Sequence, residues 1–132
     1  MDLYDYTNKY GALTETSAKK VFRQVVEICN NLHMTAGVLH RDIKDENVLI
    51  NITTLEVKLI DFGCATSYEE KEFHHFSGTP EFTAPEVFTV GKYRPESSTV
   101  WTLGTFLYVL TIGDIPFEKT DQIIAGTRKY KV

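Results

Sequence analysis

The sequence predicts an α+β fold that is mainly helical, with short β-hairpins between two long helices. Apolar residues recur at helical spacing from Val21 to Leu32, which is typical of a half-buried helix. A second run, from Val100 to Ile112, is apolar nearly all round, as expected of a helix enclosed by its surroundings. Between these helices lie short runs rich in β-branched residues, which are typical of strands.

Local signals along the chain justify each element in turn. Thr14 can cap the first long helix, with Glu15 in its first turn, and Gly37 ends the helical pattern. Three short apolar runs are the predicted strands: Val38–Leu39, Val48–Ile50 and Val57–Ile60. The polar segments that follow these strands therefore lie on turns, and loops on a rigid scaffold commonly carry catalytic groups.

Composition restricts the possible functions. With 132 residues, of which 42% are hydrophobic, the chain can bury the core of one domain. A net charge of −4 argues against nucleic acid or an anionic membrane as the main partner. Neither a membrane span nor a signal peptide is evident, so we expect a cytoplasmic protein that can also be nuclear. Cys29 and Cys64 are expected to be reduced thiols.

Three groups suited to phosphoryl transfer stand at fixed spacings. His40-Arg41-Asp42 is followed five residues later by Asn47, and Asp61 opens the later run Asp61-Phe62-Gly63. These spacings match a sequence template for phosphoryl transfer, in which an Asp accepts a hydroxyl proton while an Asn and a second Asp hold Mg²⁺. Mg²⁺ prefers such hard oxygen ligands. Further along, the segment from Gly78 to Glu86 ends in Ala-Pro-Glu. Each motif alone is weak evidence, but the combination is specific.

Together these motifs resemble the protein kinases, and Lys44, two residues after Asp42, resembles the serine/threonine branch. The resemblance implies transfer of the γ-phosphate of ATP to Ser or Thr hydroxyls, with ATP and Mg²⁺ as cofactors. It implies that Asp42 is the catalytic base, that Lys44 steadies the transferred phosphate and that Thr79 bonds Asp42. Asn47 and Asp61 would hold the metal. His40 would be a packing residue that supports Phe62.

Three segments are similar to the Pim family of serine/threonine kinases: Asp2–Tyr6 with Gly11–Leu13, His40–Asn47, and Gly113–Glu118. Most kinases place an Asp before Val-Trp in the buried helix, whereas Thr99 stands there in this chain, and Pim kinases also lack that Asp. The resemblance implies that Asp2 approaches the ATP ribose and that Leu49 lies under the adenine. Four acids would recognise arginines upstream of the phosphorylated residue: Asp5, Asp45, Glu46 and Asp114. The alternative is that these acids are ordinary solvated surface.

The kinase signature set also contains a Gly-rich loop and a strand Lys, and nothing before His40 matches either one. We therefore expect residues 1–132 to be a partial kinase domain. This partial domain would run from a segment near the hinge through the buried helix that follows the activation segment. It would lack the N-terminal lobe of a kinase. When completed, the kinase is expected to be a monomer. Its partners would be protein substrates with Arg-rich sites. The alternative function is a non-catalytic, kinase-like binding module.

Overall fold

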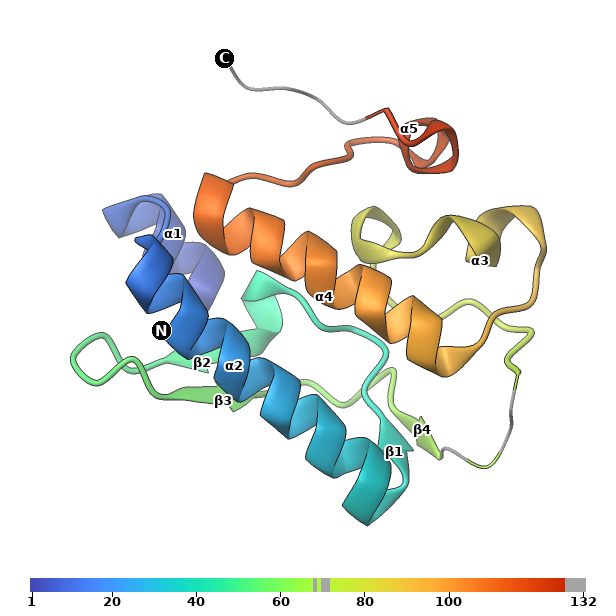
Figure 1. The fold of residues 1–132 in the computed structure, drawn as a ribbon, viewed down its shortest axis with the longest axis horizontal. Coiled ribbons are helices and arrows are strands. Elements are labelled where there is room, and N and C mark those ends of the chain that lie inside the picture. Colours follow the sequence, from blue (N-terminus) through green and yellow to red (C-terminus); the bar gives the residue numbers. More distant parts are fainter. Residues whose placement is uncertain (68, 70–71, 128–132) are drawn as a thin grey trace.

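The computed structural model describes residues 1–67, 69 and 72–127, and it has the predicted α+β architecture (Figure 1). The α-helices are α1 (Leu3–Tyr10), α2 (Glu15–Asn31), α3 (Pro85–Thr89), α4 (Pro95–Ile112) and α5 (Thr120–Ala125). The short helical turns are η1 (Leu32–Ala36), η2 (Asp45–Asn47) and η3 (Pro80–Phe82), and the strands are β1 (Val38–Leu39), β2 (Val48–Ile50), β3 (Val57–Leu59) and β4 (Thr66–Ser67).

Helix α2 forms where the periodic pattern predicts it. The Thr14 hydroxyl accepts a hydrogen bond from the Ser17 amide at 3.3 Å, which satisfies one of the free amides of the first turn. The helix continues into the wider π-helical turn η1, and Gly37 ends it in the left-handed conformation at φ 61°. One face of α2 is buried and contributes Ala18, Val21, Val25 and Cys29 to the core.

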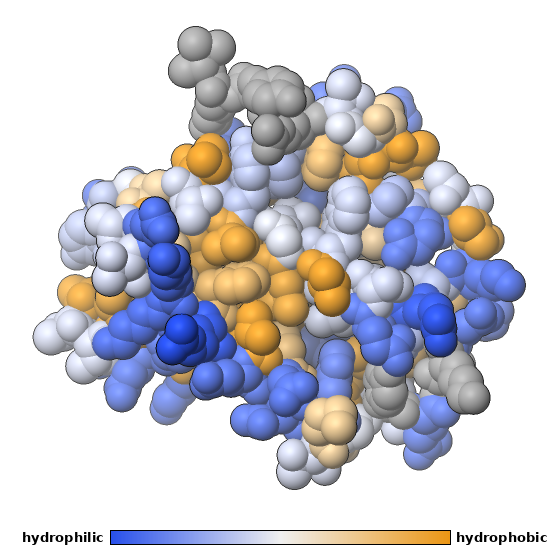
Figure 2. All heavy atoms as spheres, viewed as in Figure 1, coloured by the Kyte–Doolittle hydropathy of each residue, from blue (hydrophilic) through white to orange (hydrophobic). Residues whose placement is uncertain are grey.

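Helix α4 packs against α2, and Phe106 and Leu110 of α4 are fully buried. The expectation that this helix is enclosed all round is wrong, because Val100 is 68% exposed and Ile112 is 46% exposed. Within the described residues α4 is covered where it faces α2, η2 and η3, and at Trp101, which stacks on Phe117. Figure 2 shows the resulting apolar area in the middle of the face on which α2 and α4 lie side by side.

Two small antiparallel sheets frame the loops that follow the strands. β2 pairs with β3, with Val48 opposite Leu59, and β1 pairs with β4. Beyond the paired strands, the Ile60 amide donates to the Asn47 carbonyl at 2.9 Å. We call the segment His40–Asn47 the catalytic loop, after the template it matches. This bond joins the end of that loop to Ile60, the residue before Asp61.

Helix α1 and strand β4 were not expected from the sequence. Asp2 caps α1, and its Oδ1 accepts from the Asp5 amide at 2.8 Å. Leu3 is the fully buried residue that anchors α1 on the core. An eight-residue helix is marginal alone, so this packing rather than propensity explains α1.

Across the described ranges, no helix has the length and apolar character that crossing a membrane requires. Both cysteines are free thiols. Burial raises the pKa of Cys29 to about 11, which keeps this thiol neutral at physiological pH.

Candidate active site

The catalytic loop begins directly after β1, and His40 holds it in place. The Asp42 amide donates to His40 Nδ1 at 3.1 Å, so the ring proton is on Nε2, which donates to the Ile60 carbonyl at 2.9 Å. The His40 ring also meets Phe62 edge-on, with ring centroids 4.8 Å apart. His40 is buried and all of its contacts are internal. Its role is therefore to position the loop around Asp42 and Phe62.

Asp42 lies at the centre of a hydrogen-bond network. Its Oδ1 accepts from the Thr79 hydroxyl at 2.7 Å. Asn47 Nδ2 donates to both the Asp42 carbonyl at 2.8 Å and Asp42 Oδ2 at 3.1 Å. Lys44 Nζ lies 3.9 Å from Asp42 Oδ2. Because both carboxylate oxygens are engaged, the orientation of Asp42 is fixed in advance.

Lys44 also bonds Thr79, at 2.8 Å from Nζ to Oγ1. The Thr79 hydroxyl therefore accepts from Lys44 and donates to Asp42. The side chains of Lys44 and Asp42 are only 17% and 12% exposed, so their charges are weakly screened. An ammonium and a carboxylate thus converge on one small, partly buried site, which is suited to binding a hydroxyl beside a transferring phosphate.

Asn47 and Asp61 fit a magnesium site. Asn47 is buried and uses Nδ2 for its bonds to Asp42, which leaves Oδ1 available as a ligand. Asp61 has a positive φ of 58°, is exposed, and its Oδ1 accepts the Gly63 amide at 3.1 Å. One amide oxygen and one carboxylate match what Mg²⁺ takes from a protein when phosphates and waters complete its shell. Within the described residues there is no group of three His, Cys, Asp or Glu side chains that could hold a metal.

The two residues predicted to contact the nucleotide are brought side by side. Asp2 and Leu49 form an isolated antiparallel bridge, and the Leu49 side chain is 37% exposed on β2. Asp2 uses Oδ1 as the helix cap described above, which leaves Oδ2 for a ligand hydroxyl. An exposed apolar side chain beside a carboxylate is compatible with a base and a ribose.

Three of the four acids predicted to recognise arginine have some solvent exposure. Asp5 lies on α1 and Glu46 on η2, and both are exposed. Asp114 follows α4, is half-buried, and its Oδ1 accepts the Ile115 amide at 2.8 Å. Because α1 packs on η2, Asp5 and Glu46 belong to neighbouring elements.

The prediction for Asp45 needs correction, because its side chain is only 7% exposed and is not part of the acidic surface. The η2 turn packs against α1, which places Asp45 inside while its neighbour Glu46 points to solvent. Burial raises the pKa of the Asp45 carboxyl, and the charges of Glu46 and Asp2 act in the same direction, while backbone amides oppose them. With so little exposure, the Asp45 carboxyl offers an incoming arginine little surface to pair with.

The segment before Thr79 touches the catalytic loop at Gly78. Its φ is 122°, and a Cβ added there would lie 2.4 Å from the Arg41 carbonyl oxygen, a distance that no side chain tolerates. Arg41 has a positive φ of 67°, donates from Nε to the Cys64 carbonyl at 2.6 Å, and lies over the Phe73 ring at 5.8 Å. These contacts join the catalytic loop to both ends of the segment that follows Asp61.

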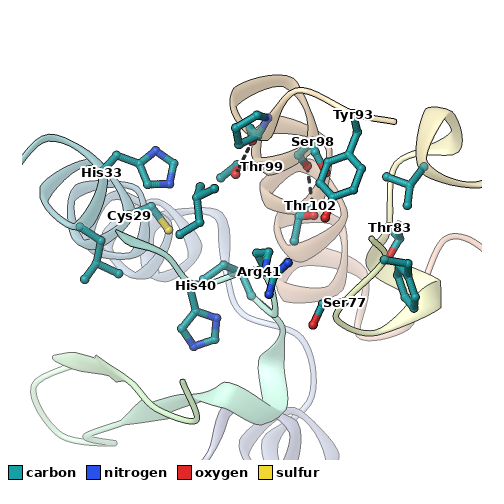
Figure 3. Close-up of a pocket in the computed structure, with 16 residues that line it drawn as sticks. Cys29, His33, His40, Arg41, Ser77, Thr83, Tyr93, Ser98, Thr99 and Thr102 are labelled. Atoms are coloured by element: carbon teal, nitrogen blue, oxygen red, sulfur yellow. Dashed lines mark hydrogen bonds between the residues drawn. The ribbon is translucent and has the colours of Figure 1, made fainter. Parts of the chain in front are cut away.

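A cavity of about 40 Å³ lies behind the catalytic loop, between α2, η1, α4 and the segment around Thr83 (Figure 3). Hydroxyl groups from several elements line it, and their donors are directed to backbone carbonyls: Thr83 to Thr79, Thr99 to Pro95, Thr102 to Phe82 and Ser98, and Tyr93 to His75. Sequence reasoning did not identify Thr83 or Thr102, because an isolated Thr carries no pattern.

Comparison with known proteins shows which family the chain resembles. The protein kinase domain family matches residues 1–131. Serine/threonine-protein kinase pim-2 of Danio rerio is 40% identical over 123 residues, which is 93% of this chain and 39% of the relative. Serine/threonine-protein kinase PSK1 of Saccharomyces cerevisiae is 38% identical over 130 residues, which is 98% of this chain and 9% of the relative. The PAS domain-containing serine/threonine-protein kinase of Mus musculus is 41% identical over 123 residues, 92% of this chain and 9% of the relative. The chain thus spans well under half the length of these relatives.

Proposed function

Because the chain belongs to the protein kinase family, we propose that it supplies the catalytic loop of an ATP- and Mg²⁺-dependent serine/threonine kinase. The observation that carries this proposal is the network in which Thr79 links Asp42 to Lys44. In this network a carboxylate and an ammonium meet at one hydroxyl. Serine/threonine-protein kinases among the relatives support the same reaction class.

The roles of the residues follow from their geometry. Asp42 orients the acceptor hydroxyl and takes its proton as the hydroxyl oxygen bonds the γ-phosphorus and the bond to the bridging oxygen breaks. Lys44 stabilises the negative charge on the transferring group. Asn47 and Asp61 would hold Mg²⁺, which neutralises phosphate charge when it is bound. Asp2 and Leu49 would contact the ribose and the base.

The proposed acceptors are proteins with arginine upstream of the phosphorylated residue. Asp5 and Glu46 are exposed on adjoining elements, α1 and η2, and Asp114 is half-exposed after α4. Guanidinium pairs with carboxylates through charge-assisted bonds. Asp45 is left out of this set because it is buried.

A second candidate is a binding module that engages protein substrates or a kinase partner without transferring phosphate. It would apply to a whole protein that lacks the Gly-rich loop and the strand Lys of the kinase signature. These groups place and neutralise the phosphates, and positioning is most of phosphoryl-transfer catalysis.

One experiment separates the two candidates. Transfer of labelled γ-phosphate to a Ser peptide with upstream arginines is measured for residues 1–132 alone and for the same residues joined to the parts of the zebrafish pim-2 relative outside the match. We expect trace transfer by residues 1–132 alone and robust transfer by the joined protein, abolished by Asp42→Asn. Asp121→Asn, an exposed acid on α5, is the control. A joined protein that binds ATP and peptide but transfers nothing would establish the binding module instead.

A further inference from the structure

Thr83 closes the turn that carries Thr79. Thr83 is buried, and its hydroxyl donates to the Thr79 carbonyl at 2.8 Å. The same carbonyl accepts the Phe82 amide at 3.1 Å, and the Thr83 amide donates to the Pro80 carbonyl at 3.1 Å. The backbone of Thr79 is therefore fixed from the end of η3, four residues further along the chain.

Thr102 ties the same turn to the core. Its hydroxyl lies 2.9 Å from the Phe82 carbonyl and 3.1 Å from the Ser98 carbonyl of its own helix. It projects from the middle of α4, whose other side packs on α2. Figure 3 shows Thr102 on α4 and Thr83 on the neighbouring segment, both at the cavity behind the catalytic loop.

These contacts form a continuous path of hydrogen bonds and backbone from α4 to the carboxylate of Asp42. The path runs from Thr102 to the Phe82 carbonyl, around the turn to Thr83, from Thr83 to the Thr79 backbone, and from the Thr79 hydroxyl to Asp42. Thr83 is buried and Thr102 is partly buried. A hydroxyl removed from water is costly unless it is hydrogen-bonded, and both are bonded to carbonyls of the Thr79 turn. A Val side chain has the same shape as Thr and would pack equally well at both positions. Packing alone therefore does not explain why Thr stands at positions 83 and 102.

We propose that Thr83 and Thr102 are positioning residues for phosphoryl transfer. They fix the Thr79 turn so that its hydroxyl meets Asp42 and Lys44 together. Neither residue touches the reacting groups, because each acts through Thr79. The inference rests on the proposed kinase function for its catalytic consequence, but its structural consequence can be measured without activity.

The chain offers matched controls. Thr99 lies on the same helix and lines the same cavity, yet its hydroxyl donates only to the Pro95 carbonyl within α4, at 2.7 Å. Thr99→Val therefore removes a partly buried hydroxyl at the same cavity without cutting the path. Thr83→Ser and Thr102→Ser keep the hydroxyl and remove a methyl group, whereas Thr83→Val and Thr102→Val keep the volume and remove the hydroxyl.

The first measurement is the side-chain rotamer of Thr79. It is obtained by NMR from the three-bond couplings to Thr79 Cγ in isotope-labelled residues 1–132. A single rotamer is expected in the parent, in Thr99→Val and in both Ser variants. Rotamer averaging is expected in Thr83→Val and, to a smaller extent, in Thr102→Val, because Thr102 acts one step further from Thr79. Parent-like couplings in both Val variants would overturn the proposal.

The second measurement is phosphate transfer by the joined protein described above. Thr83→Val and Thr102→Val should lower kcat about tenfold, the order expected from loss of one aligning hydrogen bond, and leave KM for ATP within about twofold. The Ser variants should restore most of the rate. Equal loss in Thr99→Val would show a general packing effect and overturn the proposal. No transfer by the unsubstituted joined protein would refute the kinase function. The Thr79 couplings would still decide whether Thr83 and Thr102 position Thr79.

Discussion

Thr79 donates its hydroxyl to Asp42 Oδ1 at 2.7 Å, although the two residues are 37 positions apart in the chain. The bond fixes one oxygen of the carboxylate, and Asn47 fixes the other. An aligned base contributes to rate only when its geometry is held near the reactive arrangement. The Thr79 hydroxyl is thus the contact through which the segment after Asp61 controls Asp42.

Replacing Thr79 should therefore lower the rate of phosphate transfer. We expect Thr79→Val to reduce kcat by roughly ten- to a hundredfold, since it cuts the bonds to both Asp42 and Lys44. Thr79→Ser, which keeps the hydroxyl, should stay within about threefold of the parent. The measurement is steady-state transfer by the joined protein, and a Ser variant as slow as the Val variant would contradict the prediction.

The exposed acid Glu46 should determine preference for arginine. We expect Glu46→Lys to raise KM for a peptide with upstream arginines at least tenfold, because a like charge replaces a pairing charge. The KM for a matched peptide without arginine should change little. Asp45→Asn, at the buried neighbour, should affect both peptides equally. If Asp45→Asn selectively weakened the arginine peptide, Asp45 would take part in arginine recognition despite its burial.

The contrast between Asp45 and Glu46 shows where sequence reasoning ends. Both are acids in one motif, and the side on which each falls depends on how the η2 turn packs on α1, which is a tertiary contact. The periodic helix α2 and the strands around the catalytic loop could be predicted, because their patterns are local. Helix α1 was missed because only one of its residues, Leu3, is fully buried.

The candidate site divides in the same way. Asp42, Asn47 and Asp61 stand at spacings that can be read along the chain, and the pairing of Thr79 with Asp42 followed from resemblance. The bonds from Lys44 to Thr79 and from Thr102 to Phe82 join segments that are distant in sequence, and no local pattern specifies either pairing. Their partners could be found only in the folded structure.

Burial of Asp45 predicts a pH dependence of stability. Its pKa is raised in the folded chain, chiefly by desolvation, so the folded state binds the proton more tightly than the unfolded state. The penalty is absent below the unfolded pKa of about 4 and is present in full above the raised folded pKa. Asp45→Asn should therefore raise the Tm at pH 7 and leave it nearly unchanged near pH 3. The test is a set of thermal melts across this range, and a lower Tm at pH 7 would mean that the charged form is stabilised by the fold.

Gly78 should be the glycine least tolerant of substitution. A Cβ there would lie 2.4 Å from the Arg41 carbonyl oxygen, whereas a Cβ at Gly91 would meet nothing within 4 Å. Both glycines have positive φ, 122° and 76°, so Gly91→Ala measures the backbone strain alone, about 1–2 kcal/mol. Gly78→Ala should cost roughly 1–3 kcal/mol more, because the backbone of Arg41 must move. It should also lower phosphate transfer, since Thr79 is the next residue and would shift away from Asp42. Chemical denaturation of both variants gives the comparison, and equal losses of stability would show that the contact between Gly78 and Arg41 relaxes freely.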